Sequence, residues 1–223
     1  IAVVLGSGLL AWPLARLLKV DSKTFLPPMM FNNCGNMGLP LAVLAFGEAA
    51  LPAAVVLFLV ENLLHFSLGV WMLDHRARLA NLWRMPMMLA ALAGLAVSLA
   101  SVALWPPLLT AIRMLGDISI PLLLFTLGVR LADATFHAWG IGLAGAVARP
   151  VLGMLIAWGA GWALGLSAQH QALLLVFGAL PPAVLNYVFA ERYRQEPDKV
   201  ASIVMVGNVA ALVFIPLALA IVL

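Results

Sequence analysis

The strongest constraint on the fold of this chain is a succession of apolar blocks, each about as long as a lipid bilayer is thick. Eight such blocks cover most of the 223 residues: 1–18, 25–46, 51–73, 86–105, 108–131, 138–164, 170–190 and 200–223. A spanning helix needs about 20 mostly apolar residues to cross a hydrocarbon core of roughly 30 Å. We therefore expect an all-α integral membrane protein with about eight transmembrane helices.

The composition excludes the soluble classes of protein. Hydrophobic residues make up 65% of the chain and charged residues 9%, against about 45–50% and about 25% in ordinary soluble domains. A disulfide scaffold is excluded because Cys34 is the single cysteine. The 12 basic residues are scattered between apolar blocks, so they form no groove for nucleic acid.

The basic residues instead predict the topology. All but Arg113 and Arg149 lie in or beside alternate links, around residues 16–24, 74–84, 130–137 and 191–199. The opposite links, 47–50, 105–107 and 166–169, carry no Lys or Arg. By the positive-inside rule the basic side is cytoplasmic, and both chain ends face out. We expect a multi-pass protein of the cytoplasmic (inner) membrane.

Two of the eight blocks contain residues that interrupt helices. Residues 31–40 read FNNCGNMGLP, and residues 178–187 read GALPPAVLNY. Backbone groups freed by such breaks are tolerated at membrane depth only inside protein or beside a water-filled cavity. Half-helix N-termini there carry partial positive charge that can hold a carboxylate. Ordinary proline and glycine kinks are the alternative explanation. The candidate substrate-binding residues in these segments are Asn32, Asn33, Asn36, Pro40, Pro181, Pro182 and Asn186.

The spacing of the two broken segments favours an inverted repeat. Pro40 and Asn186 are 146 positions apart, and this interval covers five spans. An odd number of spans makes the two segments run in opposite directions, as in inverted-repeat transporters. Two units of this length would exceed the chain by about two spans, which we expect to precede Ile1.

Three of the ionisable residues inside apolar blocks are candidate site residues: Glu61, His65 and Arg149. Glu61 and His65 are four positions apart in the third block, so they share a helix face. Ionisable groups in a bilayer are costly and usually face a cavity or a partner, so this pair is a candidate coupling-ion site. A hydrogen-bonded pair that holds helices together is the alternative. Arg149 in the sixth block could hold a substrate carboxylate, or pair with Glu61 or Asp117.

Several short motifs resemble those of the auxin efflux carrier family. Residues 33–41 (NCGNMGLPL) and 46–48 (FGE) are similar to the family's first broken-helix signature. Residues 180–184 (LPPAV), 188–193 (VFAERY) and 198–202 (DKVAS) resemble the family's matching C-terminal segment. The intervening span is resembled by Ile120, Pro121, Leu127, Gly128 and Leu131.

The resemblance implies ten spans arranged as two inverted five-span repeats, of which this chain lacks the first two spans. In the family, the broken helices cross in a transport domain that moves against a scaffold domain. Members include plant auxin exporters and bacterial permeases for malonate, malate and related anions. Asn33 matches the crossover asparagine that contacts the substrate carboxylate in the plant relatives, and Asn186 stands where those relatives have the second crossover proline.

The expected organisation is first-repeat transport helices at 1–73, scaffold helices at 86–131 and second-repeat transport helices at 138–223. The expected function is secondary active transport of small organic anions by alternating access at the crossing, as in the bacterial malonate permeases. No phosphate loop for direct use of ATP is present. No zinc motif or Ser–His pair indicates an enzyme.

Two alternatives stay open: a sodium-coupled symporter of the bile-acid type, and a non-transporting sensor or channel on the same scaffold. We expect no cofactor, and either H⁺ or Na⁺ as the coupling ion. The expected partners are a carboxylate substrate and the lipid bilayer, without nucleic acid; a homodimer is left open.

Overall fold

The computed structural model describes residues 1–75, 86–132 and 138–223. In chain order, the helices of these ranges are α1 (Ala2–Leu17), α2 (Ser22–Met30), η1 (Cys34–Gly38), α3 (Leu39–Phe46), η2 (Glu48–Ala50), α4 (Leu51–Leu64), η3 (His65–Gly69), α5 (Val70–Leu73), α6 (Pro86–Leu99), α7 (Pro106–Ala132), α8 (Trp139–Ala163), α9 (Ala168–Ala179), α10 (Leu185–Arg192) and α11 (Pro197–Val222). The described residues are thus organised as helices, which confirms the predicted all-α membrane fold.

Each apolar block of the sequence coincides with a helix or with an interrupted series of helices. In the described residues, three continuous helical stretches are long and apolar enough to cross a membrane: Glu48–Leu73, Trp139–Ala163 and Pro197–Val222. Shorter apolar stretches cover Ala2–Leu17 and Cys34–Phe46. The shorter lengths in the second and seventh blocks follow from the predicted breaks, since α2 stops before η1 and α9 stops before α10.

The two breaks have different local causes. Leu180 precedes Pro181 and is extended, with φ −59° and ψ 143°. A proline disfavours the helical conformation of the residue before it, so α9 ends at Ala179. Phe31 after α2 is also extended, with φ −108° and ψ 114°, and two asparagines follow it. Asparagine side chains compete for backbone hydrogen bonds and so disfavour helix interiors.

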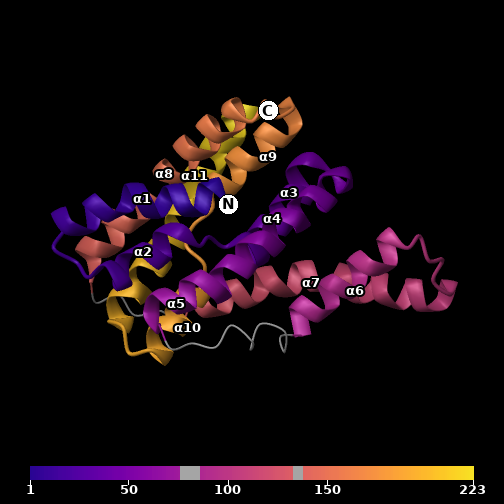
Figure 1. Ribbon diagram of the computed structural model, residues 1–223, viewed down its shortest axis with the longest axis horizontal. Coiled ribbons are helices and arrows are strands. Elements are labelled where there is room, and N and C mark those ends of the chain that lie inside the picture. The colour runs from indigo at the N-terminus through magenta and orange to yellow at the C-terminus, as the bar shows by residue number, and fades with distance from the viewer. Residues whose placement is uncertain (76–85, 133–137) are drawn as a thin grey trace.

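Helices from both ends of the chain pack together. α8 contacts α1, α9 and α11, and α2 contacts α1, α8 and α11. Figure 1 shows α1, α8, α9 and α11 gathered on one side of the molecule, with both termini near them. The pair α6 and α7 extends away from this group (Figure 1), and most of its described side chains are exposed. α7 nevertheless contacts η1, so it reaches the first broken helix.

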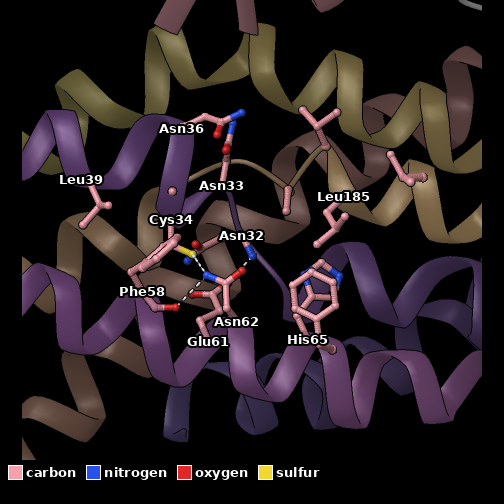
Figure 2. Close-up of a pocket in the computed structure, with 15 residues that line it drawn as sticks. Asn32, Asn33, Cys34, Asn36, Leu39, Phe58, Glu61, Asn62, His65 and Leu185 are labelled. Atoms are coloured by element: carbon pink, nitrogen blue, oxygen red, sulfur yellow. Dashed lines mark hydrogen bonds between the residues drawn. The ribbon is translucent and has the colours of Figure 1, made fainter. Parts of the chain in front are cut away.

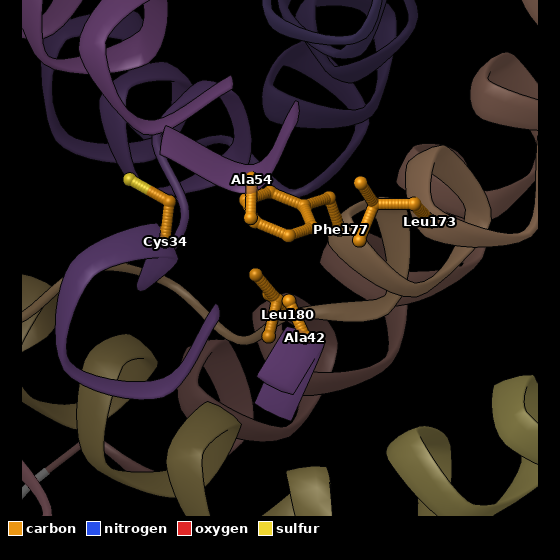
Figure 3. Packing of buried hydrophobic residues seen from close by; sticks show 6 residues of the cluster. All are labelled: Cys34, Ala42, Ala54, Leu173, Phe177 and Leu180. Atoms are coloured by element: carbon orange, nitrogen blue, oxygen red, sulfur yellow. The ribbon is translucent and has the colours of Figure 1, made fainter. Parts of the chain in front are cut away.

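An apolar cluster fills the space between the two broken helices. Cys34 and Ala42 contribute from the first broken helix, and Leu173, Phe177 and Leu180 from α9 and its end, with Ala54 from α4 (Figure 3). The cluster is buried, because Leu180 and Ala42 have no exposed surface. It therefore fixes the second half of one broken helix against the first half of the other.

Glycines allow α8 and α9 to lie in contact. A Cβ atom on Gly178 would lie 2.5 Å from the Gly153 carbonyl oxygen, and one on Gly153 would overlap the Gly178 carbonyl oxygen. Small residues at helix crossings let membrane helices approach closely. The contact matters because α9 ends two residues before Pro181, where the second helix is broken.

Candidate functional site

The two unwound segments cross and pair with each other. The Asn33 N–H donates to the Pro181 carbonyl at 2.8 Å, and the Ala183 N–H donates to the Phe31 carbonyl at 3.0 Å. Between these bonds, Asn32 and Pro182 form an isolated antiparallel bridge. Asn32 and Pro182, at the centre of the crossing, lie 150 positions apart, compared with the 146 that separate Pro40 and Asn186. Asn186 lies inside α10 instead.

The pairing leaves the backbone groups of the two central residues pointing outward, and nearby side chains meet them. The Asn32 N–H donates to Oε1 of Glu61 on α4. On the other side, Nδ2 of Asn208 on α11 donates to the Pro182 carbonyl at 3.1 Å. Buried backbone groups require partners. These two polar side chains therefore satisfy groups that helix interruption leaves free within the membrane.

Polar side chains also donate hydrogen bonds to the last backbone carbonyls of α9. Nδ2 of Asn32 donates to the Phe177 carbonyl at 2.8 Å, and Nη1 of Arg149 donates to the Gly178 carbonyl at 3.1 Å. The last carbonyls of a helix lack intrahelical partners and carry partial negative charge. The buried guanidinium of Arg149 thus serves the C-terminus of α9. Among the described side chains it forms no ion pair with Glu61 or Asp117.

A cavity of about 430 Å³ opens beside the crossing (Figure 2). Its walls come from both broken helices and from α4 with η3. It is lined by Asn32, Asn33, Cys34, Gly35, Asn36, Leu39, Phe58, Glu61, Asn62, His65, Phe66, Ala183, Val184, Leu185 and Val188. The volume lies in the range of small-molecule sites, and the lining combines amide groups with apolar side chains.

Two half-helix N-termini meet at this cavity. One belongs to the helical stretch that begins at Cys34, and the other to α10, which begins at Leu185. The first residues of both line the cavity. Helix N-termini present free N–H groups and about half a positive charge each. Because no Lys or Arg stands among the described lining residues, these termini are the main positive groups at the cavity wall.

The amide side chains of the cavity are held by specific partners. Nδ2 of Asn33 donates to Oδ1 of Asn208 at 3.1 Å. Nδ2 of Asn62 donates to the Phe58 carbonyl at 2.8 Å and contacts Sγ of Cys34 at 3.7 Å. Figure 2 shows Asn62, Glu61 and Cys34 converging beneath Asn33 and Asn36. Both amides therefore keep a free oxygen or N–H for a ligand.

His65 joins the third apolar block to both broken helices. Its ring stacks on Phe31 with centroids 4.2 Å apart and meets the edge of Phe189 at 5.2 Å. It opens η3, a π-helical turn in which Gly69 makes room for the Phe31 ring. Such π turns are frequent at functional sites. The buried Nε2 atom of His65 has no hydrogen-bond partner among the described residues.

The structure brings together half of the candidate residues found in the sequence. Those that line the cavity are Asn32, Asn33, Asn36, Glu61 and His65. The others surround it: Pro181 and Pro182 form the crossing, Pro40 begins α3, Asn186 binds the Phe31 carbonyl at 3.0 Å, and Arg149 binds Gly178. None of these five is among the lining residues.

Among the contributors that were not predicted as site residues are Cys34, Phe58, Asn62 and Asn208. Cys34 lies within the broken-helix motif, and its position there was the only available signal. Asn62 and Asn208 are polar residues in apolar blocks, which is a signal that packing explains equally well. Phe58 gives no signal, because it resembles any lipid-facing or core aromatic residue.

Comparison with known proteins adds independent evidence. A search of the curated proteins gave no match to this chain. A family model described as "Membrane transport protein" matches residues 76–219. The matched region includes α9, α10 and most of α11, and so contains one of the two crossing segments and Asn208. The chain therefore belongs to the membrane transport protein family, the auxin efflux carrier family that its motifs resemble.

Proposed function

We propose that this protein is a secondary transporter of small organic anions, and that the carboxylate binds in the cavity at the crossing. The observation that carries the proposal is the convergence of two half-helix N-termini on one cavity with amide side chains. Family membership supports membrane transport as the activity. The substrate class comes from the chemistry of the cavity.

The cavity suits a carboxylate for two reasons. Free N–H groups at helix N-termini bind anions without a basic side chain. The side chains of Asn33 and Asn36 add amide groups beside the first of these N-termini. Apolar residues such as Phe58, Phe66 and Val188 then receive the remainder of the molecule. A malonate-like dicarboxylate is the first substrate to test.

The transport cycle proposed here is alternating access in the cytoplasmic membrane, in which the broken helices belong to a transport domain that moves against a scaffold domain. The reciprocal pairing of the crossing segments supports this arrangement, because each broken helix supplies one donor and one acceptor to the other. The proposed coupling ion is a proton carried by Glu61. Sodium coupling, as in the bile-acid type, and a sensor without transport are the competing outcomes of the experiments below.

The first experiment measures uptake of labelled mono- and dicarboxylates into proteoliposomes that contain the full-length protein. We expect saturable uptake. An inwardly directed proton gradient should stimulate it, and a sodium gradient should not. Asn33→Ala should reduce uptake at least tenfold, since it removes an amide from the cavity wall. Thr110→Ala is the matched control, because Thr110 is an exposed residue on α7 and its variant should transport normally.

A binding readout separates transport from sensing. Cys34 is the single cysteine of residues 1–223 and lines the cavity, so a small thiol reagent reports on this site once any cysteine outside these residues is replaced. Bound substrate should slow its modification in the wild-type protein, and Asn33→Ala should lose this protection. Protection without uptake would make the protein a sensor. If no acid is taken up and no acid protects Cys34, the proposed substrate class is refuted.

A further inference from the structure

A second cavity lies on the other side of the crossing. It has a volume of about 380 Å³ and mostly apolar walls from α1, α4, α9 and the end of α8. Of its lining residues, Asn32 and Glu61 also line the first cavity, and no other described residue is shared between the two. These two residues therefore form the wall between the cavities.

The Asn32 side chain has an incomplete set of hydrogen bonds. Its Nδ2 atom donates to the Phe177 carbonyl, while its buried Oδ1 atom has no partner among the described residues. Asn32 is 3% exposed, so bulk water does not satisfy this oxygen. A buried acceptor without a donor is costly. The Oδ1 atom therefore requires a hydrogen-bond donor beside Asn32.

The Glu61 carboxyl contacts Asn32 and, when protonated, could supply that donor. Its Oε1 atom already accepts the backbone N–H of Asn32, so the carboxyl and the asparagine are in direct contact (Figure 2). An ionised carboxylate has only acceptors, whereas a protonated one has an O–H donor. A proton on the second oxygen of Glu61 would therefore complete a reciprocal pair with Asn32.

We propose that Glu61 and Asn32 together form a proton site in the wall between the two cavities, in which the protonated Glu61 carboxyl donates to Oδ1 of Asn32. The proton comes from water in one cavity and leaves to water in the other. Glu61 changes from a carboxylate to a neutral acid and back, and no other bond changes. The site deepens the proposed transport function, on which its role in coupling rests.

Coupling follows from the charge at the first cavity. Glu61 is the one acidic residue among its described lining residues. While ionised, Glu61 competes with a substrate carboxylate for the positive half-helix N-termini. Once protonated, Glu61 no longer competes, and the half-helix N-termini can bind the substrate carboxylate. One proton therefore accompanies each bound carboxylate.

Other titratable groups face Glu61 and belong to its environment. Cys34 approaches from η1 and Arg149 from α8. His65 lies one turn further along the same helical stretch. Of these, only Cys34 and His65 line the first cavity. Any test of the proton site must therefore assign the titrating group directly.

Infrared difference spectroscopy of the full-length protein in lipid makes that assignment without substrate. The acid-minus-neutral spectrum should contain the C=O band of a protonated carboxyl group that shifts in D₂O. Glu61→Gln should remove one component of this absorption, which the difference between the wild-type and variant spectra isolates from the other carboxyl groups. Asn32→Ala should keep it but move it to higher wavenumber, because the carboxyl O–H loses its acceptor. Asn32→Asp, which keeps the size of the side chain, should change the band by placing a second carboxyl beside Glu61.

The outcomes are distinct. A carboxyl absorption in Glu61→Gln identical to that of the wild type would overturn the proton site. An unshifted band in both Asn32 variants, with normal helix content by circular dichroism, would remove Asn32 from it. In proteoliposomes, Glu61→Gln should lose accumulation driven by a pH gradient, whereas Thr110→Ala on the exposed face of α7 should keep it. If no acid protects Cys34 from modification in the wild-type protein, the proposed substrate class is refuted. The spectroscopic result for the proton site would be unaffected.

Discussion

At the scale of single residues, the buried polar side chains are explained by the backbone groups that they satisfy. Asn208 is the clearest case, because it binds three groups at once: the carbonyls of Pro182 and Val204, and the amide of Asn33. The sequence showed only a polar residue in an apolar block. Which backbone groups needed it depended on where two distant segments cross.

Asn208→Leu keeps the size of this side chain and removes its hydrogen bonds. The Pro182 carbonyl and the Asn33 amide would then lack their partners, at a cost of about 1–3 kcal/mol. Thermal unfolding in detergent should therefore show a lower midpoint, and substrate should protect Cys34 less well. Val209→Ala changes the neighbouring residue, which is 51% exposed, and should leave both quantities unchanged. An equal loss in both variants would contradict this role of Asn208.

At the scale of secondary-structure elements, the close contact of α8 and α9 positions the second break. Gly153 and Gly178 have no room for a side chain at this contact. By contrast, a Cβ atom on Gly159 of α8 would meet no neighbouring atom within 4 Å. The same substitution should therefore have opposite effects at different positions of one helix.

Gly153→Ala should force α8 and α9 apart and destabilise the protein by about 1–3 kcal/mol, the usual cost of overpacking. It should also reduce uptake, since the Arg149 bond to Gly178 lies at the same contact. Gly159→Ala should leave stability unchanged or raise it by about 0.4–1 kcal/mol, because it restricts the unfolded chain. Unfolding midpoints and uptake rates for the two variants provide the comparison; equal midpoints would refute this close contact.

At the scale of the whole molecule, a polar cluster joins the first broken helix to the turn before α11. Thr24 near the start of α2 donates to Oε2 of Glu196 at 2.6 Å, and Gln195 donates to Thr24 at 3.1 Å. Lys199 pairs with the same carboxyl of Glu196. These bonds hold the pKa of Glu196 below its ordinary value of 4.5, first through Lys199 and then through Thr24.

The lowered pKa fixes the sign of a pH effect. A carboxyl whose pKa is lower in the folded state stabilises the fold above its unfolded pKa and loses that contribution as pH falls through the folded value. The unfolding midpoint of Glu196→Gln should thus lie below that of the wild type at neutral pH and converge with it in acid. Thr24→Val should cost about 1 kcal/mol. Glu191→Gln, on the exposed end of α10, should show no such dependence; if it does, the cluster is not the cause.

Much of the fold was predictable from local sequence. Eight apolar blocks predicted the helices, because helix length in a membrane is fixed by bilayer thickness. The second break was predictable from Pro181, since proline acts on the residue directly before it. The predicted division into segments 1–73, 86–131 and 138–223 stays a prediction, as do the substrate-binding roles of eight candidate residues and the coupling-ion roles of Glu61 and His65.

Local sequence therefore determined the class of protein, the positions of its helices and the two places where helices break, all of which depend on neighbouring residues. Tertiary packing decided that Asn32 faces Pro182, that Arg149 serves the end of α9, and that Glu61 binds Asn32. These contacts join residues from 29 to 150 positions apart, as their numbers show. Their partners depend on how the broken helices cross, and local propensity carries no information about that geometry.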